Sequence, residues 1–235
     1  FIMSYNGSQI FSVQDGMMLF EKQIDPSLIA YLDKKAQKNN FPIFTYYTDP
    51  IITNNPDNEH IQAEASLNRM RIMGVDNFPE AIDFYTHKCM LVSDDEEALV
   101  GLEDHWKRRL NGTLDVFRSE DYFLEVVPLS VNKGDSLSIL MDKLNITRDE
   151  VIAIGEGVCD IQMIQLAGLG IAMGNAIDAV KQCADHTTLS NEEDGVAAAV
   201  EKAIIAEIRP ADIPLDKLNE RAKHALMGNL GIQYT

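Results

Sequence analysis

The pattern of hydrophobic and polar positions divides the chain into two parts that meet near residue 121. Beyond this point, short apolar runs alternate with amphipathic stretches of helical period. The apolar runs predict strands at 123–129 (FLEVVPL), 151–155 (VIAIG), 169–174 (LGIAMG) and 186–190 (HTTLS), and the stretches after them predict helices. Strands that alternate regularly with helices form βαβ units, so this part predicts a doubly wound parallel sheet.

The part before residue 121 carries hairpin signals and aromatic strands instead. Residues 1–5 (FIMSY) predict a strand that turns at Asn6-Gly7, and a hairpin follows with its turn at 14–16. This pattern predicts an α+β module inserted into the sheet domain. We therefore expect a first core part at 1–16, the α+β module at 17–121, a second core part at 122–206 and a polar helical tail at 207–235.

The composition narrows the classes of function. A net charge of −17 argues against nucleic acid as a partner, because counterion release requires a stripe of Lys and Arg. The one basic run, WKRRL at 106–110, fits the solvated face of a helix. No apolar stretch is long enough to span a bilayer, so we expect no membrane association and a cytoplasmic location. The three cysteines lack the spacing of a zinc site or a disulfide framework.

Two acids, Glu156 and Asp160, follow directly after the apolar strand at 151–155. Ligands of open α/β sheets bind at the carboxyl ends of the strands, so we expect both side chains at that edge. Hard oxygen ligands suit Mg²⁺, which typically takes one or two protein carboxylates and completes its shell with phosphate and water. The alternative is that Asp160 only caps the following helix and Glu156 is a solvated loop acid. The turn alone leaves both interpretations open.

Two further positions could bind phosphate. Lys133 stands just before the predicted helix that follows strand 123–129, where an ammonium and free backbone N–H groups would favour an anion. Asn175 follows a glycine at the end of strand 169–174. Taken alone, an exposed surface lysine and an ordinary turn are the simpler interpretations. Because the net negative charge repels phosphate at long range, such a site would depend on local cations, helix N-termini or a metal.

The order of these segments resembles a known family. The stretch LEVVPLSVNKGDSLSILMDKLNI, followed by VIAIGEGVCDIQMIQLAGLGIAMGNAIDAVKQCADHTTLSNEEDGVA, closely resembles the C-terminal half of Cof-type phosphatases of the haloacid dehalogenase (HAD) superfamily. SYNGSQIF resembles the Asn-Gly strand that precedes their cap domain. The resemblance implies a Rossmann-like α/β core with an inserted α+β cap. It also implies Mg²⁺-dependent hydrolysis of a small phosphorylated metabolite, such as a sugar phosphate, through an aspartyl-phosphate.

The resemblance also implies roles for individual residues. Lys133 matches the lysine that neutralises the phosphoryl group. The metal motif of the family, Gly-Asp-x-x-Asn-Asp, falls on residues 155–160, so Glu156 and Asp160 stand at metal positions. Cys159 stands at the position of the motif's Asn, where it would contact phosphate, and Asn175 is a further phosphate-binding position.

Two departures from the family predict impaired or lost turnover. No Asp-x-Asp sequence occurs in the chain, and the nucleophile motif of the family, Asp-x-Asp-Gly-Thr, is expected upstream of Phe1. The second departure lies within the metal motif, at Glu156 and Cys159. Glu156 is one methylene longer than the Asp of the family, which weakens a Mg²⁺ site of strict octahedral geometry. Cys159 is a poorer hydrogen-bond donor than Asn. We therefore expect either a fragment of an enzyme or a catalytically silent HAD-like binding or structural protein.

Overall fold

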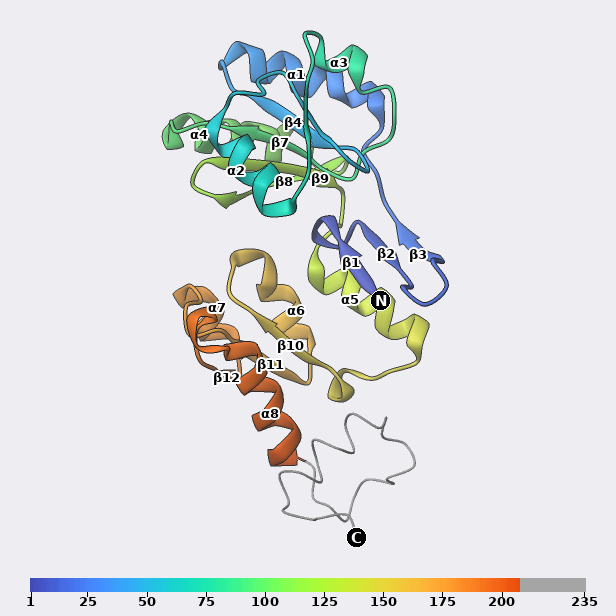
Figure 1. Cartoon of the computed structure of the whole chain (residues 1–235), viewed down its shortest axis with the longest axis vertical. Coiled ribbons are helices and arrows are strands. Elements are labelled where there is room, and N and C mark those ends of the chain that lie inside the picture. The colour runs from blue at the N-terminus through green and yellow to red at the C-terminus, as the bar shows by residue number, and fades with distance from the viewer. Residues whose placement is uncertain (208–235) are drawn as a thin grey trace.

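Residues 1–207, which the computed structural model describes, fold into two lobes (Figure 1). The upper lobe in the figure contains one six-stranded sheet, and the lower lobe contains two three-stranded sheets. The chain starts in the lower lobe, builds the upper lobe, and returns to complete the lower one. The upper lobe is therefore an insertion into the lower lobe.

The six strands of the upper lobe lie in the order β6-β5-β4-β7-β9-β8. They are β4 (Ile43–Tyr46), β5 (Ile51–Thr53), β6 (Ile72–Gly74), β7 (Cys89–Val92), β8 (Leu114–Glu120) and β9 (Phe123–Pro128). Neighbouring strands are antiparallel except for β5 and β6. Strands β4, β7 and β9 are buried along their whole length, so the sheet needs cover on both faces.

Helices supply this cover on both sides. On one face, α1 (Ile29–Lys38) and α4 (Glu96–Arg109) bury Leu32 and Trp106 against the strands, with the short α3 (Phe78–Ala81) beside them. On the other face, α2 (Glu59–Asn68) packs Ile61 and Ala65 onto the aromatic residues of β4. The upper lobe is thus an α+β module with its own core.

Strand β9 corrects one prediction from the sequence. The apolar run at 123–129 is expected to begin the parallel sheet, but β9 pairs with β7 and β8 in the upper lobe, so that prediction is wrong. A fully buried strand has the same apolar pattern in a parallel and in an antiparallel sheet, so periodicity could not separate the two.

Strand pairing also crosses the boundaries expected after residues 16 and 121, because β2 (Gln9–Phe11) pairs with β3 (Met18–Glu21) and β8 with β9. The change of lobe follows β3 and β9 instead.

The lower lobe contains the parallel sheet that the sequence predicts. Strands β10 (Ile152–Gly155), β11 (Leu169–Ala172) and β12 (His186–Thr187) lie side by side in parallel. The helices of this lobe are α5 (Lys133–Leu144), α6 (Ile161–Leu166), α7 (Asp178–Cys183) and α8 (Gly195–Glu207). Ala153, Ile164 and Val180 are at the centre of the core that they form with the strands. The predicted α/β class, with an α+β insertion, is confirmed.

The first residues form a small antiparallel sheet beside α5. Strand β1 (Ile2–Ser4) pairs with β2, and β2 pairs with β3, as the hairpin signals predict. The turn between β1 and β2 takes positive φ at three consecutive residues, Tyr5 (50°), Asn6 (57°) and Gly7 (98°). Gly7 packs closely on α5, because Ser136 Oγ donates a hydrogen bond to its carbonyl oxygen at 2.7 Å. This turn is therefore fixed on the helix that begins at Lys133.

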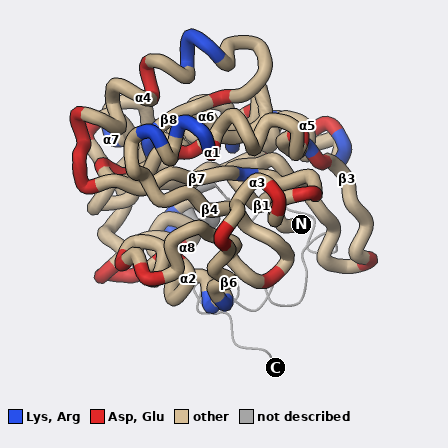
Figure 2. Tube along the Cα trace, turned by 90° about the horizontal axis from the view of Figure 1, so that it is seen from above, with Lys and Arg blue, Asp and Glu red and all other residues tan. Residues whose placement is uncertain are grey.

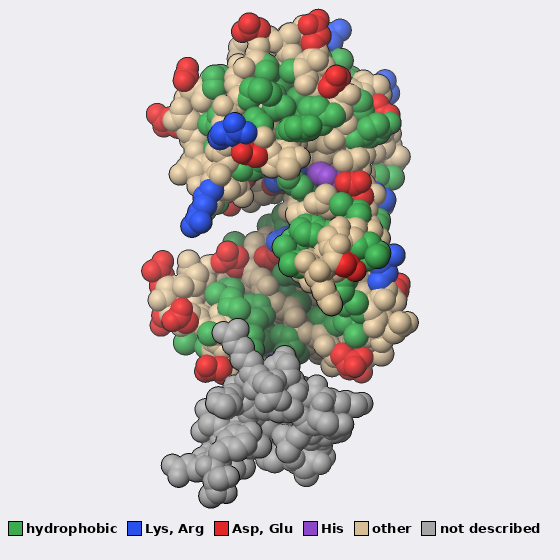
Figure 3. All heavy atoms as spheres, turned by 45° about the vertical axis from the view of Figure 1, so that its right-hand side comes forward, with side chains coloured by type: hydrophobic (Ala, Val, Ile, Leu, Met, Phe, Trp, Pro, Cys, Tyr) green, Lys and Arg blue, Asp and Glu red, His purple; other side chains and the backbone are tan. Residues whose placement is uncertain are grey.

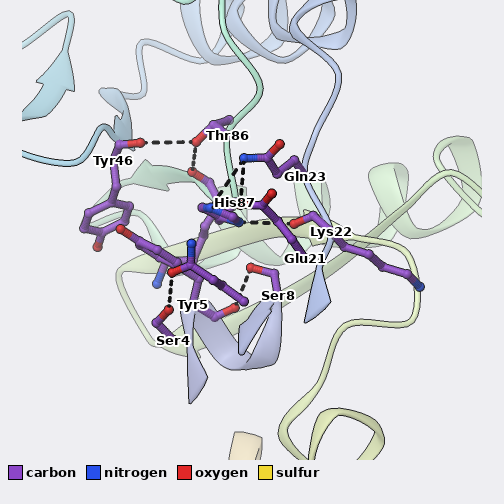
Figure 4. Close-up of polar contacts among 11 residues, drawn as sticks. Ser4, Tyr5, Ser8, Glu21, Lys22, Gln23, Tyr46, Thr86 and His87 are labelled. Atoms are coloured by element: carbon purple, nitrogen blue, oxygen red, sulfur yellow. Dashed lines mark hydrogen bonds and ion pairs between the residues drawn. The ribbon is translucent and has the colours of Figure 1, made fainter. Parts of the chain in front are cut away.

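The two lobes meet around His87. The ring of Tyr5 stacks on the imidazole of His87 with the centroids 4.8 Å apart, and it lies 5.7 Å from the ring of Tyr46. Figure 4 shows this stack together with Lys22, whose carbonyl oxygen lies 3.2 Å from His87 Nδ1. Burial lowers the pKa of His87, so the ring is neutral at pH 7. An aromatic stack thus docks the upper lobe onto the Tyr5–Gly7 turn.

Acidic residues occur on both lobes, and Figure 2 shows them scattered over the trace. The basic run expected on a helix face forms the last turn of α4, where cations suit the helix dipole. Within residues 1–207, no helix combines the length and the apolar character that a membrane crossing requires. The tail predicted at 207–235 lies outside the described residues, apart from Glu207 at the end of α8.

Gly7→Ala is expected to destabilise the protein by about 1–3 kcal/mol more than Gly16→Ala. Both glycines have positive φ, at 98° and 70°, so both variants meet backbone strain. Only at Gly7 does the new methyl group collide with a neighbour, because it would lie 2.3 Å from Ser136 Oγ, whereas nothing lies within 4 Å at Gly16. Thermal unfolding followed by circular dichroism measures the difference, and equal melting temperatures would contradict this packing.

Candidate functional site

A buried carboxylate organises the turn after β10. Asp160 Oδ2 accepts hydrogen bonds from the backbone N–H groups of Glu156, at 2.9 Å, and Gly157, at 3.0 Å. The side chain therefore reaches back to the strand end and makes no capping bond to α6, so the interpretation of Asp160 as a helix cap is wrong. The approach requires a glycine at the strand end, because a Cβ on Gly155 would lie 2.4 Å from Asp160 Cβ.

Lys133 reaches the same carboxylate from a different element. Its Nζ lies 2.5 Å from Asp160 Oδ1, so the pair joins α5 to the turn after β10. Helix α5 begins here because Asn132 caps it, with Asn132 Oδ1 accepting a hydrogen bond from the N–H of Asp135 at 2.8 Å. Lys133 is the first residue of the helix, and the positive end of the helix dipole at this end favours an anion.

The pKa of Asp160 reflects two opposing effects. Burial of the carboxyl group raises the pKa, but hydrogen bonds from Lys133 and from the N–H groups of Gly157 and Glu156 lower it by more. The resulting pKa lies below the ordinary value of an aspartate. Asp160 is therefore ionised at neutral pH and forms a true ion pair with Lys133.

Glu156 and Asn175 meet at the carboxyl ends of β10 and β11. Asn175 Nδ2 donates a hydrogen bond to Glu156 Oε2, and Asn175 Oδ1 accepts one from the N–H of Asn191 at 2.9 Å. The loop after β12 thus fixes the Asn175 amide, which in turn orients the carboxylate of Glu156. Glu156 is exposed, and its Oε1 has no hydrogen-bond partner among the described residues.

Glu156 is the acid best placed to take a metal ion. Both oxygens of Asp160 are already engaged, by Lys133 and by backbone N–H groups. Residues 1–207 contain no group of three or more His, Cys, Asp and Glu side chains that could hold a metal. Mg²⁺ does not need such a group, because it commonly binds through one or two carboxylates, phosphate oxygens and water. The side chains present fit Mg²⁺ held by Glu156 in this way.

Cys159 lies on the same turn and offers little to a ligand. Burial raises the pKa of its thiol, and the carboxylates of Glu125 and Asp160 raise it further against the opposing effect of Lys133 and Lys88. The thiol is therefore protonated at neutral pH. A protonated thiol is only a weak hydrogen-bond donor.

A cavity of about 470 Å³ lies beside these residues, between the two lobes. Figure 3 shows the molecule hollowed at this level. Lys133, Cys159 and Asn6 line the cavity from the lower lobe, and Asp115 and Phe117 line it from β8 of the upper lobe. A larger hollow of about 650 Å³ lies beside α8, but no lysine or arginine of the described residues lines it. The cavity between the lobes is the candidate active site, because it contains the lysine of the ion pair.

Sequence reasoning missed the charged pair behind the upper wall of this cavity. Lys88 Nζ lies 3.2 Å from Glu125 Oε2, and Asn6 Nδ2 donates a hydrogen bond to the same oxygen at 2.8 Å. Glu125 is the one acid of an otherwise apolar strand, and a charge within a buried run is the signal that could have indicated it. The bond from Asn6 crosses from the lower lobe to the upper one.

Known proteins share this architecture. The family model for haloacid dehalogenase-like hydrolases matches residues 1–200. The crystal structure of a haloacid dehalogenase-like hydrolase from Bacteroides thetaiotaomicron superposes with a TM-score of 0.80 at 42% identity, over 86% of this chain and 76% of that one.

Two proteins of Bacillus subtilis are similar in sequence. Phosphatase YwpJ is 29% identical over 82% of this chain and 61% of its own length. The 5-amino-6-(5-phospho-D-ribitylamino)uracil phosphatase YcsE is 46% identical over 39% of this chain and 37% of its own length. This chain therefore spans less than two thirds of the length of either relative.

These similarities confirm the resemblance to Cof-type phosphatases that the sequence motifs indicate. The match of the family model covers most of the 235 residues, including both parts of the lower lobe and the whole upper lobe. The chain therefore belongs to the haloacid dehalogenase-like hydrolases.

Proposed function

We propose that this chain forms the phosphate- and magnesium-binding part of a phosphomonoester hydrolase whose substrate is a small phosphorylated metabolite, such as a sugar phosphate. The observation that carries the proposal is the ion pair of Lys133 and Asp160, 2.5 Å long, at the carboxyl end of β10 and beside the cavity between the lobes. The phosphatases among the relatives support the same type of reaction.

Lys133 is the group that would bind the phosphoryl oxygens. Lys133 is the first residue of α5, so its positive charge and the positive end of the helix dipole would both favour a phosphate. Asp160 holds this ammonium in place through their ion pair. Phosphoryl transfer depends mainly on positioning and charge neutralisation, and both are supplied here by residues on three separate elements.

Glu156 would hold Mg²⁺, with Asn175 fixing the orientation of its carboxylate. When bound, the ion neutralises charge on the phosphate oxygens and orients them. Asp160 supports this arrangement by keeping the N–H groups of Glu156 and Gly157 turned toward itself, which sets the shape of the turn. Cys159 stands where the resemblance implies an amide, so phosphate would gain only a weak thiol donor on that side.

We further propose that these 235 residues alone do not turn over a substrate. Covalent phosphoryl transfer of the kind that the resemblance implies needs a positioned pair of aspartates, and the sequence contains no Asp-x-Asp. A second candidate is a catalytically silent HAD-like protein that binds a phosphorylated ligand, which the thiol of Cys159 favours. Three free cysteines suit a reducing compartment, so we also propose a cytoplasmic location.

The 235-residue chain is expected to bind inorganic phosphate in the presence of Mg²⁺ without hydrolysing para-nitrophenyl phosphate. Lys133→Ala should weaken phosphate binding by about tenfold or more, because a charged donor is lost. Lys143→Ala, near the other end of α5, is the matched control and should bind phosphate normally. Titration calorimetry and nitrophenol release measure the two properties.

The binding result and the hydrolysis result test different parts of the proposed function. A chain that binds no phosphate would remove the proposed function, together with the silent binding alternative. Hydrolysis clearly above that of Lys133→Ala would overturn the proposed lack of turnover and leave the phosphate site in place.

Asp160→Asn is expected to lower the free energy of unfolding by about 2–4 kcal/mol at pH 7, because it leaves Lys133 without its buried partner. The pKa of Asp160 is lowered in the folded state, so its ionic contribution is fully present above the unfolded pKa of about 4. The contribution is lost as the pH falls through the folded pKa. Urea unfolding of both proteins between pH 7 and pH 3 should therefore show a difference that shrinks below about pH 4.

Asp142→Asn serves as the control for this series, because Asp142 is an exposed residue of α5, the helix that begins with Lys133. It should be as stable as the wild type throughout. If the difference in free energy of unfolding between wild type and Asp160→Asn stays constant down to pH 3, the carboxylate of Asp160 does not act through its charge.

A further inference from the structure

A second pocket, of about 370 Å³, lies between α1 and α4 of the upper lobe. Lys35 and Lys38 line it from the last turn of α1, and Gly101 and His105 line it from α4. A Cβ on Gly101 would meet nothing within 4 Å, so the space beside α4 is open. The volume lies within the usual range for small-molecule sites. We refer to this space as the α1–α4 pocket.

The six-stranded sheet separates the α1–α4 pocket from the cavity that contains Lys133. Leu124 and Val126 of β9 belong to the core that α1 and α4 cover. Glu125 lies between them in the strand and therefore points to the opposite face, where Asn6 of the lower lobe donates a hydrogen bond to it. A ligand in the α1–α4 pocket would thus not contact the residues of the proposed function.

The α1–α4 pocket is lined by basic side chains and, among the described residues, by no acid. Lys35 and Lys38 form no ion pair within residues 1–207. Both lysines suit the negative end of the α1 dipole, but the dipole does not explain why His105 lines the same pocket from a second helix. Like charges three positions apart on a helix repel each other, so an anion between them would stabilise both.

The basic run at the end of α4 extends this positive surface. Arg108 and Arg109 follow His105 by three and four positions, so they lie next to it along the helix. Neither arginine forms an ion pair in the part of the chain that the structure describes, whereas Lys107 is paired with Glu103. An anion near His105 would therefore meet positive charge beyond the lining itself, in a chain whose net charge is −17.

Unpartnered buried polar atoms also gather in these two helices. Within residues 1–207, four buried side-chain nitrogen or oxygen atoms have no hydrogen-bond partner, and all belong to α1 or α4: Tyr31 Oη, Asp33 Oδ1, His105 Nε2 and Trp106 Nε1. Buried polar groups are bonded as a rule, and an exception commonly marks the place of a bound water or ion.

His105 combines this feature with a position in the lining of the α1–α4 pocket. Its other ring nitrogen, Nδ1, is not among the buried atoms without a partner, and no hydrogen bond within residues 1–207 engages it. Nδ1 is therefore the nitrogen that a ligand in the pocket can reach.

We propose that the α1–α4 pocket is a second anion site, which binds a phosphate dianion. Lys35 and Lys38 bind its oxygens from α1, and His105 donates to it from α4 through Nδ1. Ammonium groups bind phosphate as point charges, and hydrogen bonds between charged groups are the strong ones. This site goes beyond the proposed function, because none of its residues takes part in that function.

Inorganic phosphate is titrated without Mg²⁺ into the full 235-residue chain and into Lys133→Ala, while the ring resonances of His105 are followed by NMR. A spectrum of His105→Gln assigns these resonances. Lys133→Ala removes the phosphate ligand of the proposed function, so it isolates the second site. In both proteins the His105 resonances are expected to shift and saturate with a Kd of about 1 mM or tighter.

Lys35→Gln and Lys38→Gln should each weaken this binding several-fold, and the double variant should weaken it by about tenfold or more. Lys34→Gln is the matched control, because Lys34 is an exposed lysine of the same helix that does not line the pocket. It should bind phosphate as the wild type does. Sodium chloride at matched ionic strength should leave the His105 resonances in place.

Three results would overturn this proposal alone: His105 resonances that do not saturate with phosphate, an equal response to chloride, or equal binding in Lys34→Gln and the double variant. Loss of the binding that depends on Lys133, with the His105 response retained, would instead remove the proposed function and leave the second site. A chain that binds no phosphate at all would overturn both.

Discussion

The carboxylate of Asp160 accepts hydrogen bonds from Lys133 on α5 and from the two backbone N–H groups that follow β10. These bonds join donors from two separate elements to one buried carboxylate, so the turn after β10 and the start of α5 hold each other in place. The exposed carboxylate of Glu156 and the ammonium of Lys133 both owe their positions to this one group. The arrangement of the proposed phosphate and Mg²⁺ sites therefore depends on Asp160 remaining ionised.

A second set of contacts extends this order to the upper lobe. Ser136 on α5 fixes Gly7, and the neighbouring Asn6 donates to Glu125 across the boundary between the lobes. Tyr5 and Asn6 have positive φ, a conformation that costs roughly 1–2 kcal/mol for a residue with a side chain. Strain of this kind persists where the surroundings require it, which is common at functional sites. The helix that begins with Lys133 thus also determines where the acids of the upper wall lie.

Most of the fold could be predicted from the sequence, because alternation of apolar strands with helices is a local property. Local sequence also singled out three site residues, because each lies next to the end of a helix or strand: Glu156, Asp160 and Lys133. The sequence could not predict which sheet contains β9, because full burial gives the same apolar pattern in parallel and antiparallel sheets. The helix-cap interpretation of Asp160 failed because only the folded turn shows which backbone groups its side chain reaches.

The contacts behind the upper wall of the cavity could not be predicted from residues that are neighbours in the sequence. Asn6 and Glu125 are 119 positions apart, and nothing in the neighbourhood of either residue indicates the other. The hydrogen bond from Asn175 to Glu156 likewise depends on the adjacency of β10 and β11. Contacts of this kind follow from topology, which a single sequence specifies only through the complete fold.

The coupling between Mg²⁺ and phosphate tests most directly whether Glu156 and Lys133 form one site. Phosphate is titrated calorimetrically into the wild-type chain, Glu156→Gln and Glu192→Gln, each with and without Mg²⁺; Glu192 is an exposed acid that serves as the control. Mg²⁺ should tighten phosphate binding several-fold in the wild type and in Glu192→Gln, and leave it unchanged in Glu156→Gln. Equal tightening in all three proteins would contradict the assignment of Glu156 as the magnesium ligand beside the phosphate.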